Sequence, residues 1–143
     1  MATHVHPVHI YYEDTDFSGV VYHANYLRYF ERAREHILGV QALVDMFKDT
    51  GVGFVVYKAI LTYKAGAVHG DRLDIETEVS VESAYRAIFH QRALRAQPAH
   101  AEHKQGELLV EGELHLACVD ANQKLVPLPK NIVDGIAAFN ASS

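Results

Sequence analysis

The stretch at residues 26–37, Tyr-Leu-Arg-Tyr-Phe-Glu-Arg-Ala-Arg-Glu-His-Ile, decides the fold of this chain. Its apolar residues recur at intervals of four, three and four residues, at Tyr26, Phe30, Ala33 and Ile37. This period places them on one face of an α-helix, and the charged residues between them fill much of the remaining surface. The pattern predicts a helix that is entered near Ala24 and Asn25, ends at Gly39 and buries one stripe.

Alternating apolar and polar residues before and after this helix predict β-strands. The clearest case is residues 73–83, where leucine, isoleucine and valine alternate with polar residues. Similar patterns predict strands at 4–12, 54–64, 85–96 and 107–119, and shorter helices at 41–49 and 130–139. The order is a strand, a long helix and then four meandering strands. It predicts an α+β fold, an antiparallel sheet of about five strands with one face covered by one long helix.

The composition favours one ordered domain over residues 1–143. Hydrophobic residues make up 49% of the chain and charged residues 22%, which is enough apolar material for a core. A formal net charge of −5, with dispersed lysine and arginine, argues against a nucleic-acid-binding face. The sequence has no apolar run long enough to span a bilayer, and its first residues lack the apolar core of a signal peptide. The single cysteine, Cys118, fits a core position and a cytoplasmic location.

The segment before the long helix carries the residues best suited to chemistry. Residues 11–25 read Tyr-Tyr-Glu-Asp-Thr-Asp-Phe-Ser-Gly-Val-Val-Tyr-His-Ala-Asn. The clustered acids end at Asp16, a turn follows at Ser18 and Gly19, and His23 lies just before the helix. The unpaired N–H groups and the dipole of a helix N-terminus favour negative charge. A carboxylate base therefore lies close to a site that can stabilise an oxyanion, as acyl transfer requires.

Local chemistry alone leaves a structural interpretation of this segment open. Repulsion from Glu13 and Asp14 would raise the pKa of Asp16 and make it a usable base. Gly19 admits backbone conformations, and a close approach of substrate, that a side chain would hinder. Equally, Asp16 could cap a turn, Gly19 could relieve strain and His23 could pack against a loop.

The Asp-Thr-Asp-Phe-Ser-Gly segment and the Tyr-His-Ala-Asn-Tyr run resemble the signature of the YbgC / 4-hydroxybenzoyl-CoA thioesterase branch of the hotdog-fold thioesterases. The match is dense over residues 8–35 and returns in Leu-Val-Pro-Leu-Pro-Lys-Asn-Ile at 125–132. The resemblance implies a hotdog fold, in which the sheet wraps around the central helix. It implies an acyl-CoA thioesterase that releases free acid and coenzyme A and uses no cofactor or metal. It also implies a homodimer, and favours a homotetramer, with active sites formed between subunits.

Carried over residue by residue, the resemblance assigns three catalytic positions. Asp16 is the catalytic carboxylate, as general base or as nucleophile. The backbone N–H at His23 holds the oxyanion while its imidazole orients water or substrate, and Tyr12 positions Asp16 or the acyl group. Substrate binding is assigned to Gly19, Val20, Asn25, Tyr57 and Lys58.

Three of the binding residues have a second interpretation. Asn25 is equally suited to capping the helix N-terminus. Tyr57 could line an aromatic or a fatty-acyl pocket. Lys58 could meet the phosphates of coenzyme A, although a solvated surface charge is the commoner role of such a lysine.

Several alternatives remain open at the level of sequence. Glu31 on the helix could be the catalytic carboxylate, although an ion pair with a neighbouring arginine is favoured. His4 and His6 share a strand face that His9 does not, so a metal site is disfavoured. The alternative functions are a dehydratase or hydratase for 3-hydroxyacyl thioesters, and a module that binds acyl carrier protein or an envelope partner.

Overall fold

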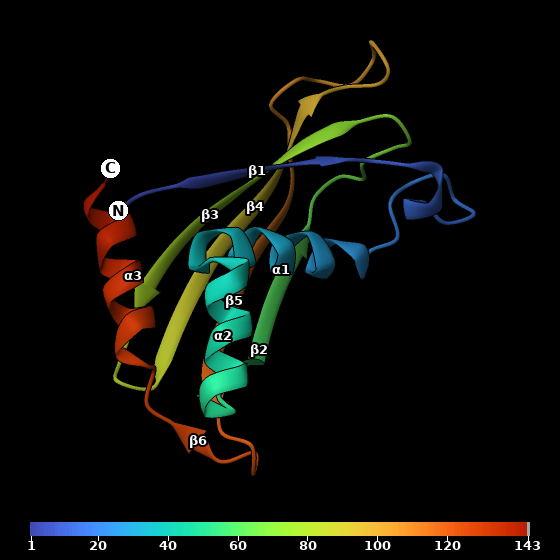
Figure 1. The fold of residues 1–143 in the computed structure, drawn as a ribbon. Coiled ribbons are helices and arrows are strands. Elements are labelled where there is room, and N and C mark those ends of the chain that lie inside the picture. Colours follow the sequence, from blue (N-terminus) through green and yellow to red (C-terminus); the bar gives the residue numbers. More distant parts are fainter. Residues whose placement is uncertain (143) are drawn as a thin grey trace.

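A computed structural model describes residues 1–142 as a six-stranded antiparallel sheet with three α-helices (Figure 1). The α+β architecture that the sequence predicts is confirmed. In chain order the elements are β1 (His4–His9), a 3-10 helix (Tyr12–Asp14), α1 (Asn25–Leu38), α2 (Val40–Thr50), β2 (Gly53–Tyr63), β3 (Arg72–Val81), β4 (Arg86–Gln97), β5 (Leu108–Val119), β6 (Leu125–Val126) and α3 (Lys130–Ala141).

Helix α1 lies across one face of the sheet and buries the predicted stripe (Figure 1). Phe30 and Ala33 have no exposed surface, and Tyr26 is 2% exposed. Gly39 ends the helix with a φ of 93°, a left-handed conformation that favours glycine. Because this stripe faces the sheet, the N-terminus of α1 is held at one end of the core.

The order of strands in the sheet differs from a simple meander. Strands β3, β4 and β5 do pair consecutively, but β2 pairs with β5, so the order is β1-β3-β4-β5-β2. The connection at residues 64–71 is too long for a tight hairpin and leads the chain from β2, at one edge of the sheet, to β3, which lies next to the other edge strand. Both β1 and β2 are therefore edge strands. The additional strand β6 is too short to show an alternating pattern.

The first strand ends earlier than its alternation predicts. Val8 and Ile10 are buried on one face as expected, but Tyr12 begins the 3-10 helix and is 77% exposed. The N–H of Tyr11 donates to the carboxylate of Asp14 at 2.8 Å. This local bond draws the backbone into a turn, so it no longer follows β3.

Two further properties follow from the elements. Cys118 is fully buried in β5, and burial raises the pKa of its thiol to about 11. Within residues 1–142, no helix has both the length and the apolar character needed to cross a membrane.

The contact between α1 and the sheet leaves no space for a side chain at Gly112 of β5. A Cβ atom built on Gly112 would lie 2.8 Å from Cε2 of Phe30. Protein cores are close-packed, so neighbouring atoms cannot move aside without strain. The glycine thus allows the backbone of β5 to approach the helix.

We expect Gly112→Ala to lower the free energy of unfolding by about 1–3 kcal/mol, because the added methyl group overpacks the core. Urea denaturation measures this change. Gly135→Ala is the matched control, since Gly135 in α3 has no neighbouring atom within 4 Å of its Cβ position. That variant should gain up to about 1 kcal/mol of helix propensity. Equal stability of Gly112→Ala and the wild type would contradict the packing argument.

Candidate active site

A tight turn displays the carboxylate of Asp16. Thr15 and Val21 form an antiparallel bridge at the base of the turn. The N–H of Asp16 donates to the carbonyl of Val20 at 2.9 Å, and the N–H of Gly19 donates to the carbonyl of Asp16 at 3.0 Å. Gly19 adopts a φ of 87°, which a residue with a side chain rarely takes. The space around its Cβ position is open.

Hydrogen bonds from Ser18 hold the pKa of Asp16 below its usual value. The hydroxyl and the N–H of Ser18 both donate to Oδ1 of Asp16. The positive charge of a protonated His23 acts in the same direction, and the slight loss of solvent opposes it. The expectation of a raised pKa is therefore wrong. The neighbouring Asp14 is engaged by the N–H of Tyr11, and the bonds to Asp16 favour its ionised form.

Free backbone donors lie at the start of α1, next to this turn. The hydroxyl of Tyr63 donates to the carbonyl of His23 at 3.1 Å, and the two rings meet edge to face. Within residues 1–142, the N–H groups of His23 and Ala24 have no hydrogen-bond acceptor. Unpaired donors at the positive end of a helix dipole can stabilise a developing negative charge.

Asn25 does not cap the helix. It is the first residue of α1, Ala24 precedes it, and no side chain caps the N-terminus. The amide Nδ2 of Asn25 instead donates to the carbonyl of Asp14 at 2.9 Å, beside a bond from the N–H of Tyr22 to the same carbonyl. The capping interpretation is therefore wrong. Asn25 fastens the helix start to the acidic segment, and its contact with substrate stays a prediction.

The ring of Tyr12 packs against His69 within one chain. Its ring centroid is 5.8 Å from that of His69, and its carbonyl accepts a bond from the hydroxyl of Thr15 at 2.7 Å. Among residues 1–142, the hydroxyl of Tyr12 makes no hydrogen bond to Asp16. The role of Tyr12 in positioning Asp16 or the acyl group stays a prediction.

Tyr57 and Lys58 are not brought to Asp16 within one chain. They lie in the middle of β2, where the ring of Tyr57 packs under the guanidinium of Arg86 at 5.5 Å. The β2 residue that reaches the start of α1 is Tyr63, through the carbonyl of His23. At about 3.3 Å per residue, six residues of strand separate Tyr57 from Tyr63 by about 20 Å. The binding roles of Tyr57 and Lys58 stay predictions.

Glu31 does not form the predicted ion pair within residues 1–142. It lies at a cavity of about 250 Å³ between α1, α2 and β2, which is lined by Arg34, Met46 and Phe54 among others. Arg34 is buried and donates to Gln91 instead, at 3.0 Å. Glu31 is therefore exposed on a different part of α1 from its N-terminus.

The histidines of β1 form a cluster with α1. The ring of His6 stacks on that of His36, with centroids 4.7 Å apart. Burial, and then the charge of His36, lower the pKa of His4 and of His6. In the part of the chain that the structure describes, no group of three or more histidine, cysteine or acidic side chains could hold a metal.

Sequence reasoning missed the platform beneath the turn, which is the segment at residues 64–71. The N–H of Val21 donates to the carbonyl of Ala67 at 2.9 Å, and Val20 and Val68 form a bridge. The N–H of Ala67 in turn donates to the hydroxyl of Tyr26 on α1 at 3.2 Å. The platform therefore connects the turn to the helix.

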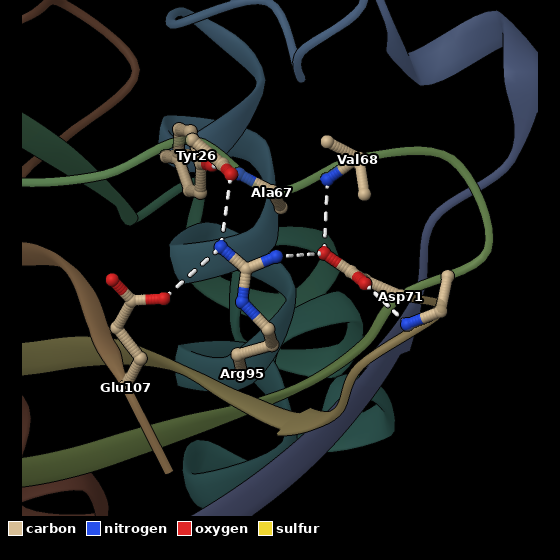
Figure 2. Close-up of polar contacts among 8 residues, drawn as sticks. Tyr26, Ala67, Val68, Asp71, Arg95 and Glu107 are labelled. Carbon is tan, nitrogen blue, oxygen red and sulfur yellow. Dashed lines mark hydrogen bonds and ion pairs between the residues drawn. The ribbon is translucent and has the colours of Figure 1, made fainter. Parts of the chain in front are cut away.

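A buried ion pair joins Asp71, the last residue of the platform, to Arg95 of β4 (Figure 2). A signal for it is present in the sequence. Arg95 follows Ala87, Phe89, Gln91 and Ala93 at intervals of two, so β4 alternation places its side chain in the core. A charged residue at an inward position requires a buried partner.

Comparison with known proteins agrees with this geometry. Residues 11–136 match the model of the thioesterase-like superfamily. The chain belongs to that superfamily. Acyl-CoA thioester hydrolase YbgC from Escherichia coli O6:H1 is 40% identical over 133 residues, which are 89% of this chain and 90% of that protein. Acyl-CoA thioesterase YbgC from Haemophilus influenzae is 36% identical over 129 residues, 88% of each chain.

Solved structures of thioesterases share the fold of this thioesterase-like protein. The crystal structure of a 1,4-dihydroxy-2-naphthoyl-CoA thioesterase from Synechocystis is 25% identical, with a TM-score of 0.82 over 96% of this chain and 98% of that one. A probable thioesterase from Bartonella henselae is 30% identical, with a TM-score of 0.73 over 90% and 100%. The resemblance to the YbgC branch and the hotdog fold are confirmed, and the protein is a thioesterase of this type.

In this thioesterase-like protein, we expect Ser18→Ala to raise the pKa of Asp16, because the variant removes a donor that stabilises the carboxylate. The depressed pKa keeps Asp16 ionised until the pH falls through that value, so the variant should protonate at a higher pH. Titration of the Asp16 side-chain carbon by NMR measures the shift. Thr15→Val is the control, since the Thr15 hydroxyl binds Tyr12 instead. An unchanged titration in Ser18→Ala would refute the assigned cause.

Proposed function

We propose that this thioesterase hydrolyses acyl-CoA with Asp16 as the catalytic carboxylate at the N-terminus of α1. The observation that carries the proposal is the pairing of an ionised carboxylate with free N–H donors of His23 and Ala24. The curated relatives that cover most of the chain are acyl-CoA thioester hydrolases. That substrate class matches what a base beside an oxyanion site can act on.

The chemistry follows from the two halves of this site. The thioester carbonyl accepts hydrogen bonds from the N–H groups of His23 and Ala24, which stabilise the negative charge that develops on its oxygen. On one route, Asp16 takes a proton from water while the water oxygen bonds to the carbonyl carbon. The carbon–sulfur bond then breaks, and the coenzyme A thiolate leaves and is protonated. The imidazole of His23 orients the water.

On the other route, an oxygen of Asp16 attacks the carbonyl carbon directly and displaces the thiolate. Water then hydrolyses the mixed anhydride, which releases the acid and regenerates the carboxylate. Both routes require an ionised carboxylate, which is the ordinary state of an aspartate at neutral pH, and the hydrogen bonds from Ser18 lower the pKa of Asp16 further. Both routes also place the developing oxyanion at the same backbone donors.

Asp16→Asn should keep the fold and lower thiol release from acyl-CoA by about 10²–10⁴-fold, the usual effect of removing a catalytic acid or base. Coupling of released coenzyme A to a thiol reagent measures the rate. Glu31→Gln removes the other candidate carboxylate and should keep most of the activity. If the two variants behave the other way round, Glu31 is the catalytic carboxylate and Asp16 is not.

We also propose a homodimer in which two sheets join along β2, with a dimer of dimers as the larger assembly. Edge strands present unpaired backbone groups that invite pairing. Strand β1 is short and contains Pro7, whereas β2 has eleven residues. Strand β2 also exposes a row of large apolar side chains, each 44–46% accessible: Val56, Tyr57, Ile60 and Tyr63. The longer, apolar edge is therefore the better surface for pairing.

Antiparallel pairing of two β2 strands would reverse one copy relative to the other. The end of β2 that carries Tyr63 and the Asp16 turn in one subunit would then lie beside the Gly53 end of the other. With the symmetry axis at the middle of the strand, Lys58 would lie on the axis, and Tyr57 would lie nearer to the active-site turn of the second subunit than to its own. The dimer would thus give Tyr57 a route to the substrate.

Sedimentation at micromolar concentration should show a species of at least twice the 16.0 kDa chain mass. Ile60→Lys should produce monomers and remove most thiol release, because a lysine on the strand edge opposes pairing. Val44→Lys is the control, since Val44 is equally apolar and 52% exposed but lies on α2. A wild-type monomer that hydrolyses acyl-CoA would rule out the shared site.

A further inference from the structure

We infer that the buried Asp71–Arg95 pair positions the catalytic turn, and that the contact between Gly66 and Val20 transmits this position to Asp16. The inference rests on the catalytic role proposed for Asp16. Neither member of the pair lies at the reacting atoms, so both are positioning residues. The first two steps are hydrogen bonds and ion pairs between named atoms, and the third is a space too small for a Cβ atom.

The first step is the carboxylate of Asp71, which has no exposed surface. Its Oδ2 accepts a bond from Nη1 of Arg95 at 2.6 Å and another from the N–H of Val68 at 2.9 Å. Its Oδ1 accepts a bond from the N–H of Ala99 at 2.7 Å (Figure 2). A buried charge with this many donors is held rigidly, because each lost bond would leave an unsatisfied polar group.

The second step is the other side of the Arg95 guanidinium. Its Nη2 donates to the carbonyl of Gly66 at 3.1 Å and lies 3.2 Å from the carboxylate of Glu107 (Figure 2). One planar group therefore binds the platform at two points, Gly66 and Asp71. The fork of donors on arginine suits this double attachment, whereas the single ammonium of a lysine does not.

The third step is the contact between the platform and the turn. A Cβ atom built on Gly66 would lie 2.9 Å from Cγ1 and 3.0 Å from Cβ of Val20. The Val20 side chain therefore lies so close to Gly66 that a Cβ atom does not fit between them. Val20 in turn accepts the N–H of Asp16 through its carbonyl at 2.9 Å. Any displacement of Gly66 moves the residue that holds Asp16.

The consequence for catalysis follows from how strongly rates depend on geometry. A misplacement of about 1 Å can lower a rate by roughly 10²-fold even when the chemical groups are intact. Asp16 is on an exposed turn with few contacts of its own. The turn therefore needs a rigid support. The buried Asp71–Arg95 pair provides this support from below the protein surface, through the platform.

The test adds one methyl group at the contact. Gly66→Ala removes no charge and no hydrogen bond, but its Cβ would overlap the branched side chain of Val20, so the turn must shift. We expect kcat for thiol release to fall by about 10- to 100-fold while KM changes little. The pKa of Asp16, followed by NMR, should rise, because a distorted turn weakens the hydrogen bonds from Ser18 to its carboxylate. Gly135→Ala, at an open position of α3, is the matched control and should keep the wild-type kcat.

Two further variants separate positioning from a general loss of stability. Val20→Ala removes Cγ1, so the double variant with Gly66→Ala should recover several-fold of kcat relative to Gly66→Ala, with Val20→Ala alone as its reference. Arg95→Lys keeps a charge for Asp71 but gives up the bond to Gly66, and it should lower kcat in the same way. Glu107→Gln keeps both platform bonds and should keep kcat.

The outcomes distinguish this inference from the proposed function. If Asp16→Asn is inactive while folded Gly66→Ala and Arg95→Lys keep wild-type kcat and an unchanged Asp16 titration, the positioning role is overturned and the proposed function stands. If Asp16→Asn is active, the proposed function fails, and the Asp16 titration in Gly66→Ala still tests the contact. If Gly66→Ala does not fold, Arg95→Lys compared with Glu107→Gln decides the question.

Discussion

The packing of α1 against the sheet is the constraint on which the rest of the structure depends. Phe30 and Ala33 are completely buried, and the backbone of Gly112 passes within contact distance of the Phe30 ring. This close approach holds the helix axis at a set height over the strands. The N-terminus of α1 therefore emerges at a defined place, where Tyr63 and the platform meet it. The position of the oxyanion donors in the proposed mechanism therefore depends on the apolar contact between Phe30 and β5, which is remote from them.

The candidate site combines an exposed reactive turn with a rigid, buried base. The pKa of Asp16 is lowered mainly by hydrogen bonds from Ser18, two residues along the chain. Burial would act in the opposite direction, so the exposed position of the turn favours the ionised carboxylate. Burial occurs at Asp71 and Arg95, where the ion pair is shielded from water and both carboxylate oxygens of Asp71 accept hydrogen bonds. This separation keeps the carboxylate accessible to a large substrate. It also keeps the turn that carries it from drifting.

The hotdog arrangement leaves the open edge at β2 beside the same site. Tyr63, the last residue of β2, donates a hydrogen bond to the carbonyl of His23. Val56 and Ile60 are exposed apolar residues of the same strand. Pairing of two such edges would complete the surface around the turn. Oligomerisation and catalysis would then share one strand.

Periodic signals in the sequence determined the elements. The intervals of four, three and four residues identified α1, and Gly39 its end, because a buried helix stripe needs that spacing. The alternation at residues 73–83 identified β3 for the same kind of reason. Local signals also placed Asp16, Gly19 and His23 in a turn before a helix. These features depend on neighbours in the chain, so one sequence can reveal them.

Only the tertiary structure decided the features that depend on residues far apart in the chain. Alternation marks β2 as a strand but carries no information on which strand it pairs with, so its place beside β5 was not predictable. The pKa of Asp16 depended on which way the Ser18 and Asp14 side chains turn, and proximity in sequence suggested the opposite sign. Asp71 and Arg95 are 24 residues apart in the chain, and they meet only when β3 and β4 pair. Composition and spacing determine which segments fold, whereas the partners of buried polar groups are set by how those segments pack.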